Sequence, residues 1–208
     1  MRPAMIVDDH PFIRSSLKAL LQQADYQVIA EADNGADALQ LAIEHEPELI
    51  ILDISMPKLD GLMVLRRLGE LDLPSKILVL TSHPAEFFAL RCMKAGASGF
   101  VSKTQDPAEL LKAINAISSG YTFFPQKTIV SVNRNEVEVT EQVLLKELSN
   151  RELNILLQLA NGLDNKQIGE YLLLSNKTVS TYKARIIEKL GVSSVVHLAE
   201  MVKRHGLL

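Results

Sequence analysis

The stretch Glu48-Leu49-Ile50-Ile51-Leu52-Asp53 decides the fold, because four consecutive apolar residues end at a carboxylate. A short apolar run bounded by charged residues is typical of a central strand in a parallel sheet whose two faces are covered by helices. Similar apolar runs occur on both sides of it, and stretches with apolar residues at helical spacing separate them. The runs predict five strands, at residues 4–7, 26–30, 48–52, 76–80 and 99–101.

The alternation of strands and helices over residues 1–120 predicts the fold class. A helix is expected after each strand, the last from about Pro107 to Ser118, where Pro107 suits the first helical turn. This alternation is typical of an α/β fold with a doubly wound, five-stranded parallel sheet and helices on both faces. Ligands bind such sheets outside the carboxyl ends of the strands, so functional residues should follow the strand ends.

Residues 149–208 carry helix start and stop signals throughout. The signals are a capping box at Ser149 and Glu152, N-caps at Asn165 and Ser175, and a helix stop at Gly191. A further helix is expected from about residue 194 to 204. The short helix, the tight turn and the longer basic helix at 176–190 predict a helix-turn-helix within an all-α domain of four helices.

Length and charge divide the chain in the same way. The 208 residues are enough for one large domain or for two ordinary ones. The formal net charge of −3 combines −5 over residues 1–120, −1 over 121–148 and +3 over 149–208. We therefore expect two modules with different partners, joined by a linker over 121–148 that holds a short helix at 141–147. The basic module is the candidate for nucleic-acid binding.

The composition excludes several classes of protein. With 47% hydrophobic and 23% charged residues, the chain is too apolar for intrinsic disorder. Its apolar runs span only a few residues, whereas a membrane helix needs about 20, and two aspartates within residues 1–10 argue against a secretory signal. Cys92 is the only cysteine, so no internal disulfide can form. We expect a cytoplasmic protein without a membrane partner.

Polar side chains with matched chemistry follow four of the expected strands. Asp8 and Asp9 follow the first strand, Asp53 the third, Thr81 the fourth and Lys103 the fifth. Neighbouring parallel strands lie about 4.8 Å apart, so these groups should converge at one edge of the sheet. Three carboxylates repel one another unless a cation neutralises them, and hard oxygen ligands suit Mg²⁺. A single aspartate after a strand is most often a turn residue, but all five residues together favour phosphoryl transfer to Asp53.

At these positions the first 120 residues resemble the receiver domain of two-component response regulators, which has a flavodoxin-like (CheY-like) fold. The matching strings are Val7-Asp8-Asp9-His10-Pro11, Leu52-Asp53-Ile54-Ser55-Met56-Pro57 with Asp60-Gly61, Leu80-Thr81-Ser82 and Gly99-Phe100-Val101-Ser102-Lys103. The resemblance implies that Asp53 accepts a phosphoryl group and that Thr81 and Lys103 contact it. It also implies a Mg²⁺ site made by Asp8, Asp9, Asp53 and the backbone carbonyl of Ser55, and a switch role for the aromatic residue Phe100.

A second class of protein uses similar residues. Phosphatases of the haloacid-dehalogenase type also combine a nucleophilic Asp with Mg²⁺, a Thr or Ser and a Lys, but they need a second Asp two residues later as general acid. Ser55 occupies that position here. Without an acid to protonate a leaving group, turnover should be slow and the phosphoryl group should persist as a signal. We therefore expect no enzyme, and we interpret His10 and His83 as loop residues without a metal-ligand partner.

The helix expected at 176–190 has two unlike faces. Val179, Tyr182, Ile186 and Leu190 recur at helical spacing and should pack on the preceding helices. The other face combines basic and small polar residues, which suit a DNA major groove. A solvated helix face would look similar, but the position as second helix of the pair favours DNA. The expected contacts are Lys166, Lys177, Thr178, Ser180, Thr181, Lys183, Arg185 and Lys189.

Residues 149–208 resemble the LuxR-type DNA-binding domain of NarL/FixJ response regulators. The matching strings are Leu148-Ser149-Asn150-Arg151-Glu152, Asn165-Lys166-Gln167-Ile168-Gly169, Leu174-Ser175-Asn176-Lys177-Thr178-Val179 and Lys189-Leu190-Gly191-Val192. Within this family, the strings at 120–125 and 175–183 are most similar to the BvgA and EvgA branch. Together with the receiver, the resemblance spans the whole chain.

The combined resemblance implies a transcriptional regulator and its partners. A sensor histidine kinase, or a small phosphodonor, would phosphorylate Asp53, and phosphorylation would control dimerisation and the binding of double-stranded promoter DNA, with RNA polymerase as a further partner. A two-fold homodimer would bind half-sites about one helical turn apart. An apolar stripe in the last helix either completes the domain core or forms a dimer interface; its members are Val195, Leu198, Ala199 and Val202.

Overall fold

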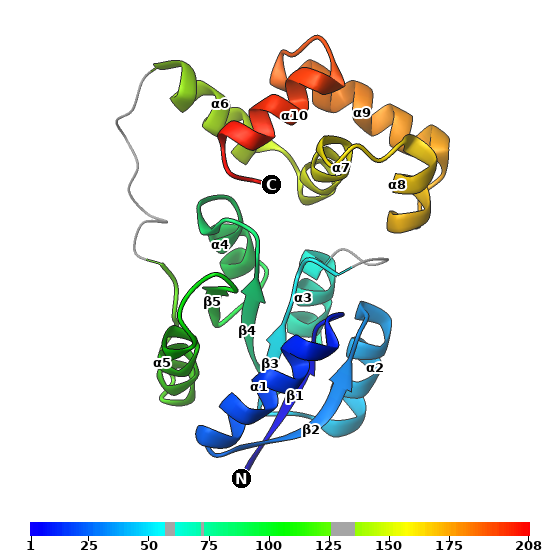
Figure 1. Ribbon diagram of the computed structural model, residues 1–208. Coiled ribbons are helices and arrows are strands. Elements are labelled where there is room, and N and C mark those ends of the chain that lie inside the picture. Colours follow the sequence, from blue (N-terminus) through cyan, green and yellow to red (C-terminus); the bar gives the residue numbers. More distant parts are fainter. Residues whose placement is uncertain (57–60, 72, 126–135) are drawn as a thin grey trace. The chain divides into compact units, whose positions relative to one another are not determined.

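The computed structural model describes residues 1–56, 61–71, 73–125 and 136–208, with side chains from residue 141 onward in the last range. The motif residues Pro57 and Asp60 lie outside the described residues. The chain divides into two compact units, residues 1–129 and 130–208. Figure 1 shows a sheet flanked by helices in the first unit and a group of packed helices in the second.

One parallel sheet forms the centre of the first unit. Its strands are β1 (Arg2–Val7), β2 (Tyr26–Ala32), β3 (Leu49–Leu52), β4 (Lys76–Thr81) and β5 (Gly99–Ser102), arranged in the order β2-β1-β3-β4-β5. All four neighbouring pairs are parallel. Successive residues of a strand point to opposite faces, and both Ile51 and Leu52 of the central strand are buried. The predicted parallel sheet with two covered faces is confirmed.

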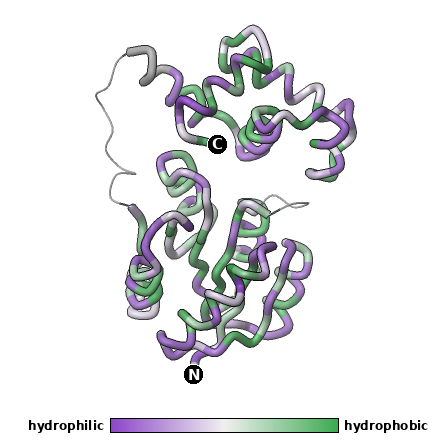
Figure 2. The backbone as a smooth tube through the Cα atoms, viewed as in Figure 1, coloured by the Kyte–Doolittle hydropathy of each residue, from purple (hydrophilic) through white to green (hydrophobic). Residues whose placement is uncertain are grey.

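Five helices cover the two faces of this sheet. They are α1 (Pro11–Gln23), α2 (Gly35–His45), α3 (Gly61–Glu70), α4 (Ala85–Lys94) and α5 (Pro107–Ser118). Residues of α1 and α5 share one buried cluster with alternate strand residues such as Ile6, Ile51 and Leu80. Helices α2, α3 and α4 contact one another in succession and cover the other face. Figure 2 shows that the central strands are mostly hydrophobic, while the helices carry both kinds of residue.

Two apolar residues on helices of the first unit are exposed. Phe12 of α1 is 87% exposed and Ile43 of α2 is 55% exposed. The buried faces are made by Leu17 and Leu21 in α1 and by Ala38 and Ala42 in α2. Each exposed residue lies five positions from a buried one, which places it about 140° away around a helix of 3.6 residues per turn. Their apolar character therefore does not mark the packed side.

The chain after α5 returns to the outer edge of β5. The backbone N–H of Phe100 donates to the carbonyl of Phe123 at 2.8 Å, and the N–H of Phe123 donates to the carbonyl of Ser98 at 3.0 Å. Gly99 and Phe123 form a parallel bridge. The first residues of the segment expected to be a linker are thus hydrogen-bonded to the sheet.

The second unit is a set of packed helices around one buried core. The helices are α6 (Glu136–Glu147), α7 (Asn150–Ala160), α8 (Asn165–Leu172), α9 (Asn176–Leu190) and α10 (Val195–Arg204). Helix α7 contacts α8, α9 and α10, and α8 packs on α9 as the first helix of the predicted helix-turn-helix. In α10, Leu198 and Val202 are buried while Val195 and Ala199 are partly exposed, so the stripe contributes mainly to the core.

Most of the predicted helix ends are observed. Ser149 and Glu152 form the capping box of α7, Ser175 caps α9, and Gly191 ends α9 in the left-handed region at φ 64°. The N-cap of α8, however, is Asp164 and not Asn165. The carboxylate of Asp164 accepts the N–H groups of the next turn, and a carboxylate is favoured there by the helix dipole as well as by its hydrogen bonds.

The short helix expected at 141–147 is longer and belongs to the second unit. Helix α6 begins at Glu136 and contacts α9. Glu141 accepts from Arg204 Nη2 at 2.9 Å and lies 3.0 Å from His205 Nε2, both at the end of α10. Leu145 and Leu148 are buried. The second half of the expected linker is therefore folded against the C-terminal helix.

No helix among the described residues is long and apolar enough to cross a membrane.

Candidate functional site

The carboxyl ends of β1 and β3 bring two buried aspartates together. Val7 and Leu52 are paired in the sheet, and the N–H of Asp53 donates to the carbonyl of Val7 at 2.8 Å. The side chains of Asp8 and Asp53, which follow these strands, are each only 1% exposed. Buried carboxylates are costly unless charges or hydrogen bonds compensate them. The compensation comes from the neighbouring strand ends.

Lys103, just after β5, bridges the two carboxylates. Its Nζ lies 2.6 Å from Asp53 Oδ2 and 2.7 Å from Asp8 Oδ2. Burial alone would lower the pKa of Lys103, but the charge of Asp53 and the hydrogen bonds to both aspartates outweigh it and raise that pKa above its ordinary value. Lys103 is therefore a protonated ammonium group in contact with both buried carboxylates.

Hydroxyl groups complete the surroundings of Asp53. The N–H of Ser55 donates to Asp53 Oδ1 at 2.8 Å, and the Ser55 hydroxyl lies 2.8 Å from that of Thr81 at the end of β4. Thr81 is fully buried, and its oxygen also accepts the N–H of His83 at 3.2 Å. One oxygen of Asp53 thus contacts Lys103 and the other contacts the loop that carries Ser55.

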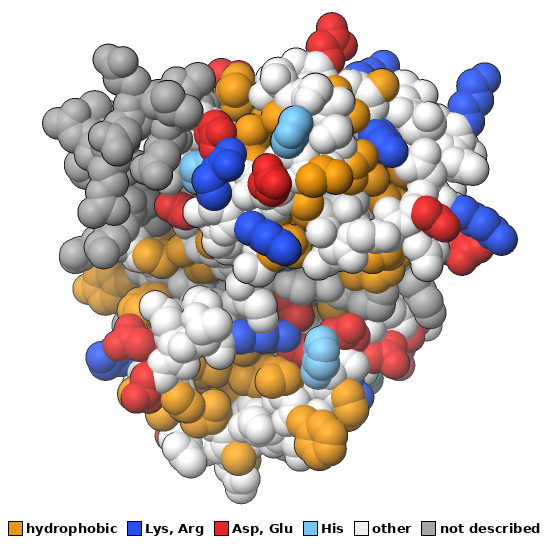
Figure 3. All heavy atoms as spheres, turned by 45° about the horizontal axis from the view of Figure 1, so that its top comes forward, with side chains coloured by type: hydrophobic (Ala, Val, Ile, Leu, Met, Phe, Trp, Pro, Cys, Tyr) orange, Lys and Arg blue, Asp and Glu red, His pale blue; other side chains and the backbone are white. Residues whose placement is uncertain are grey.

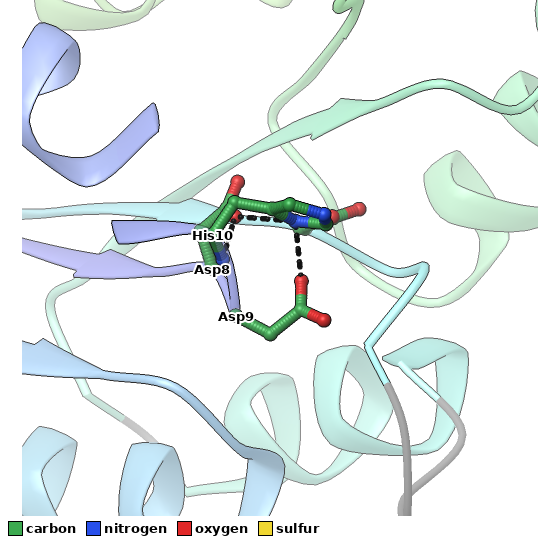
Figure 4. Close-up of side chains that lie close together, drawn as sticks. Asp8, Asp9 and His10 are labelled. Atoms are coloured by element: carbon green, nitrogen blue, oxygen red, sulfur yellow. Dashed lines mark hydrogen bonds and ion pairs between the residues drawn. The ribbon is translucent and has the colours of Figure 1, made fainter. Parts of the chain in front are cut away.

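Figure 4 shows Asp9 and His10 beside Asp8. Asp9 is partly exposed, but its Oδ1 is buried and has no hydrogen bond among the described residues. His10 Nδ1 lies 2.7 Å from that oxygen and 3.4 Å from Asp8 Oδ1. One atom each of Asp8, Asp9, His10 and Asp53 lie within 4.8 Å of one another, which is compact enough to hold a metal ion. The donor set is mainly carboxylate, as Mg²⁺ requires.

His10 lies outside the helices and strands, as expected for a loop residue, but it also lies within reach of possible metal ligands. The backbone N–H of His10 donates to Asp8 Oδ1 at 2.8 Å, which turns the residue back over the acidic cluster just before α1 begins at Pro11. A search for metal-ligand spacing between distant elements overlooks such a contact, because the relevant partners are the two preceding residues.

His83 and Cys92 have packing roles instead. The His83 ring stacks on Phe88 with centroids 4.3 Å apart, and burial lowers its pKa despite the nearby charge of Asp53. Cys92 of α4 is fully buried, and burial raises the pKa of its thiol to about 12. Both groups are therefore neutral near pH 7, and the cysteine is an unreactive core residue.

Phe100, the expected switch residue, lies in β5. Its side chain is fully buried, and it pairs with Val79 of β4, two residues before Thr81. Thr81 itself pairs with Ser102. Thr81 and Phe100 therefore lie on neighbouring strands, two register positions apart.

In the second unit, α9 presents the mixed face that its sequence predicts. Val179, Ile186 and Leu190 are buried, and Tyr182 is partly buried. The exposed side forms a shallow groove lined by Asn176, Lys177, Ser180, Thr181, Ala184, Arg185 and Glu188. Four of the expected DNA contacts therefore lie together. Glu188 was not expected there, although its position one turn after Ala184 places it on the same face.

The other expected DNA contacts lie elsewhere. Lys166 and Lys183 line a second groove with residues at the start of α8 and α9. The Thr178 hydroxyl lies 2.7 Å from that of Ser175 at the cap of α9, and Lys189 Nζ lies 2.8 Å from Glu152 Oε1. Thr178 and Lys189 are thus engaged within the domain, by contacts that residue spacing on α9 alone does not reveal.

Charge is dispersed over the second unit as a whole. In Figure 3, basic side chains on the visible face alternate with acidic ones and do not form one continuous patch. The net charge of +3 over residues 149–208 therefore does not by itself locate a nucleic-acid surface. The groove on α9 is distinguished by its combination of cations with small polar groups, which is the chemistry of a DNA major-groove contact.

The two units match known domain families. Residues 4–115 match the response regulator receiver domain, and residues 146–202 match the luxR family of bacterial regulatory proteins. The chain is 45% identical over 203 residues to the virulence-factor positive transcription regulator BvgA of Bordetella pertussis, covering 98% of this chain and 97% of that protein. It is 34% identical over 205 residues to the DNA-binding transcriptional activator EvgA of Escherichia coli, covering 98% of each.

A solved structure has the same fold over the whole chain. RcsB from Salmonella enterica serovar Typhimurium, bound to promoter rprA in the presence of phosphomimetic BeF3−, aligns with 97% of this chain and 98% of that one at a TM-score of 0.71 and 23% identity. The predicted resemblance to the BvgA and EvgA branch is confirmed. Both domains and full-length relatives agree, so the chain belongs to the NarL/FixJ family: it is a two-component response regulator, a transcription regulator with a receiver domain followed by a LuxR-type DNA-binding domain.

Proposed function

We propose that Asp53 is the phosphoryl acceptor of this response regulator, and that a sensor histidine kinase or a small phosphodonor supplies the group. The bridging position of Lys103 carries the proposal, because its Nζ contacts the Asp53 oxygen directly and can follow the negative charge onto a phosphoryl group. In the transfer, an Asp53 oxygen bonds to phosphorus and the donor group leaves. The Thr81 hydroxyl, which already contacts the Ser55 loop, then donates to a phosphoryl oxygen.

The cation of this site is Mg²⁺, held by Asp8, Asp9, Asp53 and the backbone carbonyl of Ser55. The buried Oδ1 of Asp9, which has no hydrogen bond among the described residues, supports this assignment because a cation would satisfy it. When bound, Mg²⁺ neutralises charge on the incoming phosphoryl oxygens and on the carboxylates. The protein side chains position the acceptor, and Lys103 contacts the Oδ2 atoms of Asp8 and Asp53.

The chain acts as a signalling protein and not as a phosphatase. Ser55 stands where a haloacid-dehalogenase enzyme has its acidic group, and its hydroxyl faces Thr81. A hydroxyl is too weak an acid to protonate a leaving group efficiently near neutral pH. The acyl phosphate on Asp53 therefore persists long enough to change the rest of the molecule, and the relatives named above are transcription regulators.

The output is binding of promoter DNA by α9. Lys177, Ser180, Thr181 and Arg185 line the groove. In this proposal, Lys177 and Arg185 contact phosphates, and Ser180 and Thr181 contact base edges. Lys166 and Lys183 add contacts along the second groove. Phosphorylation promotes a homodimer that binds two half-sites, and the bound dimer contacts RNA polymerase. RcsB, which shares this fold, has been captured on promoter DNA with a phosphomimetic.

A phosphorylation assay tests the acceptor. The full chain, Asp53→Asn and the control Asp25→Asn are incubated with acetyl phosphate and Mg²⁺ and separated on a phosphate-affinity gel. Asp25 is exposed and in the left-handed region at φ 61°, which Asn tolerates. We expect a shifted band for the wild type and Asp25→Asn and none for Asp53→Asn. Phosphate on Asp53→Asn would show that the acceptor is a different residue.

A DNA-binding assay tests the output surface. DNA sites are first selected in vitro with the phosphorylated protein, and affinity is then measured at several salt concentrations. Lys177→Gln and Arg185→Gln should each weaken binding and lower the slope of log affinity against log salt by about one. Lys203→Gln, on an exposed position of α10, is the matched control and should behave like the wild type. Equal slopes for all three variants would exclude α9 as the phosphate-contacting surface.

A further inference from the structure

The acidic cluster of the receiver contains a potential metal ligand that the proposed function does not use. His10 Nδ1 lies 3.4 Å from Asp8 Oδ1 and 2.7 Å from Asp9 Oδ1 (Figure 4). Neighbouring ligands of a tetrahedral Zn²⁺ ion with bonds of about 2.0–2.1 Å are about 3.3 Å apart. One imidazole nitrogen and three carboxylates, from Asp8, Asp9, His10 and Asp53, give four protein donors within 4.8 Å of one another.

His10 Nδ1 lies next to Asp9, and most of the other contacts in the cluster are made by Asp8 and Asp53. Lys103 takes the Oδ2 atoms of Asp8 and Asp53, and backbone N–H groups donate to the Oδ1 atoms of the same two residues. Asp9 Oδ1 is buried and receives no hydrogen bond among the described side chains and backbone. His10 Nδ1 is the ion-pair partner of this oxygen at 2.7 Å, and a cation shared by the two groups would replace that contact.

The local backbone holds His10 at this position without using its ring. His10 is the N-cap residue of α1, with extended φ and ψ of −94° and 110°, and its side chain makes no capping hydrogen bond. Its N–H is bonded to Asp8, and its carbonyl accepts the N–H of Arg14 at 3.1 Å. Asp9 and His10 are also the two members of the cluster with exposed surface, so their side chains can rotate to close around an ion.

We propose that His10 Nδ1 is an additional ligand of this cation site and that it favours divalent transition metals such as Zn²⁺ over Mg²⁺. Imidazole is a good ligand for Zn²⁺, whereas Mg²⁺ is bound by oxygen and keeps several waters. The inference rests on the proposed function in one respect, since it concerns the same site. It adds that a metal with affinity for nitrogen competes with Mg²⁺ for the aspartates.

Calorimetric titration of the full chain at one fixed, mildly alkaline pH tests the proposal. Wild type, His10→Asn and His45→Asn are each titrated with Mg²⁺ and, separately, with Zn²⁺. Asn is a preferred N-cap, so His10→Asn keeps the start of α1, which a thermal melt verifies. We expect His10→Asn to weaken Zn²⁺ binding by about tenfold or more and Mg²⁺ binding by less than about twofold. His45, exposed in the last turn of α2, is the matched control and should change neither affinity.

Histidine side-chain ¹⁵N NMR spectra give a second readout. Zn²⁺ should shift the Nδ1 resonance of His10, which is assigned by its absence from the spectrum of His10→Asn. The proposal is overturned if Zn²⁺ affinity falls no more than Mg²⁺ affinity, or if Nδ1 of His10 does not shift. If the wild type fails to bind Mg²⁺ at all, the cation site of the proposed function fails instead. Mg²⁺ binding with unchanged Zn²⁺ affinity in His10→Asn contradicts only the role of His10.

Discussion

Lys103 stabilises two carboxylates that would otherwise be buried without a counter-charge. Asp8 and Asp53 come from adjacent strands and their side chains are each 1% exposed, so repulsion between them would be weakly screened. The ammonium group contacts one oxygen of each and leaves the other oxygens towards Ser55 and His10. A single residue thus sets both the charge balance of the site and the side from which a cation can approach.

Replacing this cation should destabilise the receiver. Lys103→Gln leaves two buried carboxylates uncompensated, so we expect the free energy of unfolding to fall by about 3 kcal/mol in the absence of divalent cations. Mg²⁺ at millimolar concentration should recover part of the loss. Urea unfolding with and without Mg²⁺ measures the loss of stability and its recovery. Lys112→Gln, which removes an exposed ion pair with Glu109, should change stability little.

The pH dependence of this effect follows from the raised pKa of Lys103. A lysine whose pKa is higher in the folded state contributes stability below its unfolded pKa of about 10.4 and loses it as the pH rises through the folded value. The difference between wild type and Lys103→Gln should therefore stay constant from neutral pH to about 9 and shrink only above about 10. A difference that already shrinks near pH 8 would contradict this assignment.

At the scale of elements, the start of α7 is tied to the end of α9. Lys189 Nζ lies 2.8 and 2.9 Å from the two oxygens of Glu152, and Glu152 also closes the capping box with Ser149. Glu152 is 4% exposed. Burial alone would raise its pKa, but the hydrogen bonds from Lys189 and Ser149 and the charge of Lys189 lower it below the ordinary value. Helix α9 is therefore anchored at its C-terminal end by an ion pair.

This ion pair should give the second unit an acid-sensitive component of stability. A carboxylate with a lowered folded pKa contributes stability above its unfolded pKa of about 4.3 and loses it as the pH falls through the folded value. Glu152→Gln should cost about 1–3 kcal/mol near pH 7, and the difference from wild type should narrow below about pH 4. Thermal melts across this range measure it. Glu200→Gln, at an exposed position of α10, should show no such convergence.

Elements were predictable where the signal is local, and less so where it is tertiary. Apolar runs located all five strands, and the strand ends placed Asp8, Asp53, Thr81 and Lys103 at one edge, because parallel register makes that a local inference. Residue spacing on α9 made Lys189 an expected DNA contact, but spacing cannot reveal its ion pair with Glu152, 37 residues earlier. Phe12 shows a related limit, because its apolar character says nothing about its angular position on α1.

The whole molecule combines two units with separate cores and opposite charge. The receiver part, residues 1–120, carries −5 and the DNA-binding part, residues 149–208, carries +3, although the chain as a whole carries only −3. The family boundaries at 4–115 and 146–202 leave out most of α6, whose Leu145 is buried and whose Glu141 contacts the end of α10. Charge does not reveal where α6 belongs; the division into compact units at residues 129 and 130 places it in the second unit.

Two cores predict two separable unfolding transitions. In scanning calorimetry, Mg²⁺ should raise the midpoint of one transition only, because its proposed ligands all lie in the first unit. At ten times its dissociation constant, the stabilisation should be about 1.4 kcal/mol. Asp9→Asn should abolish the shift, whereas Asp25→Asn should retain it. A Mg²⁺ response in both transitions would mean that the units unfold together or that the second unit binds the ion.

The short pairing between Phe123 and the edge of β5 affects how this protein can be divided. An outer parallel strand with free N–H and carbonyl groups is a template for pairing with another chain. Here the chain's own continuation occupies part of that edge, through the N–H of Phe100 and the carbonyl of Ser98. A receiver fragment that stops at residue 120 would expose these groups. Such fragments could then self-associate by pairing at the edge of β5. A fragment that continues beyond Phe123 would keep its edge protected.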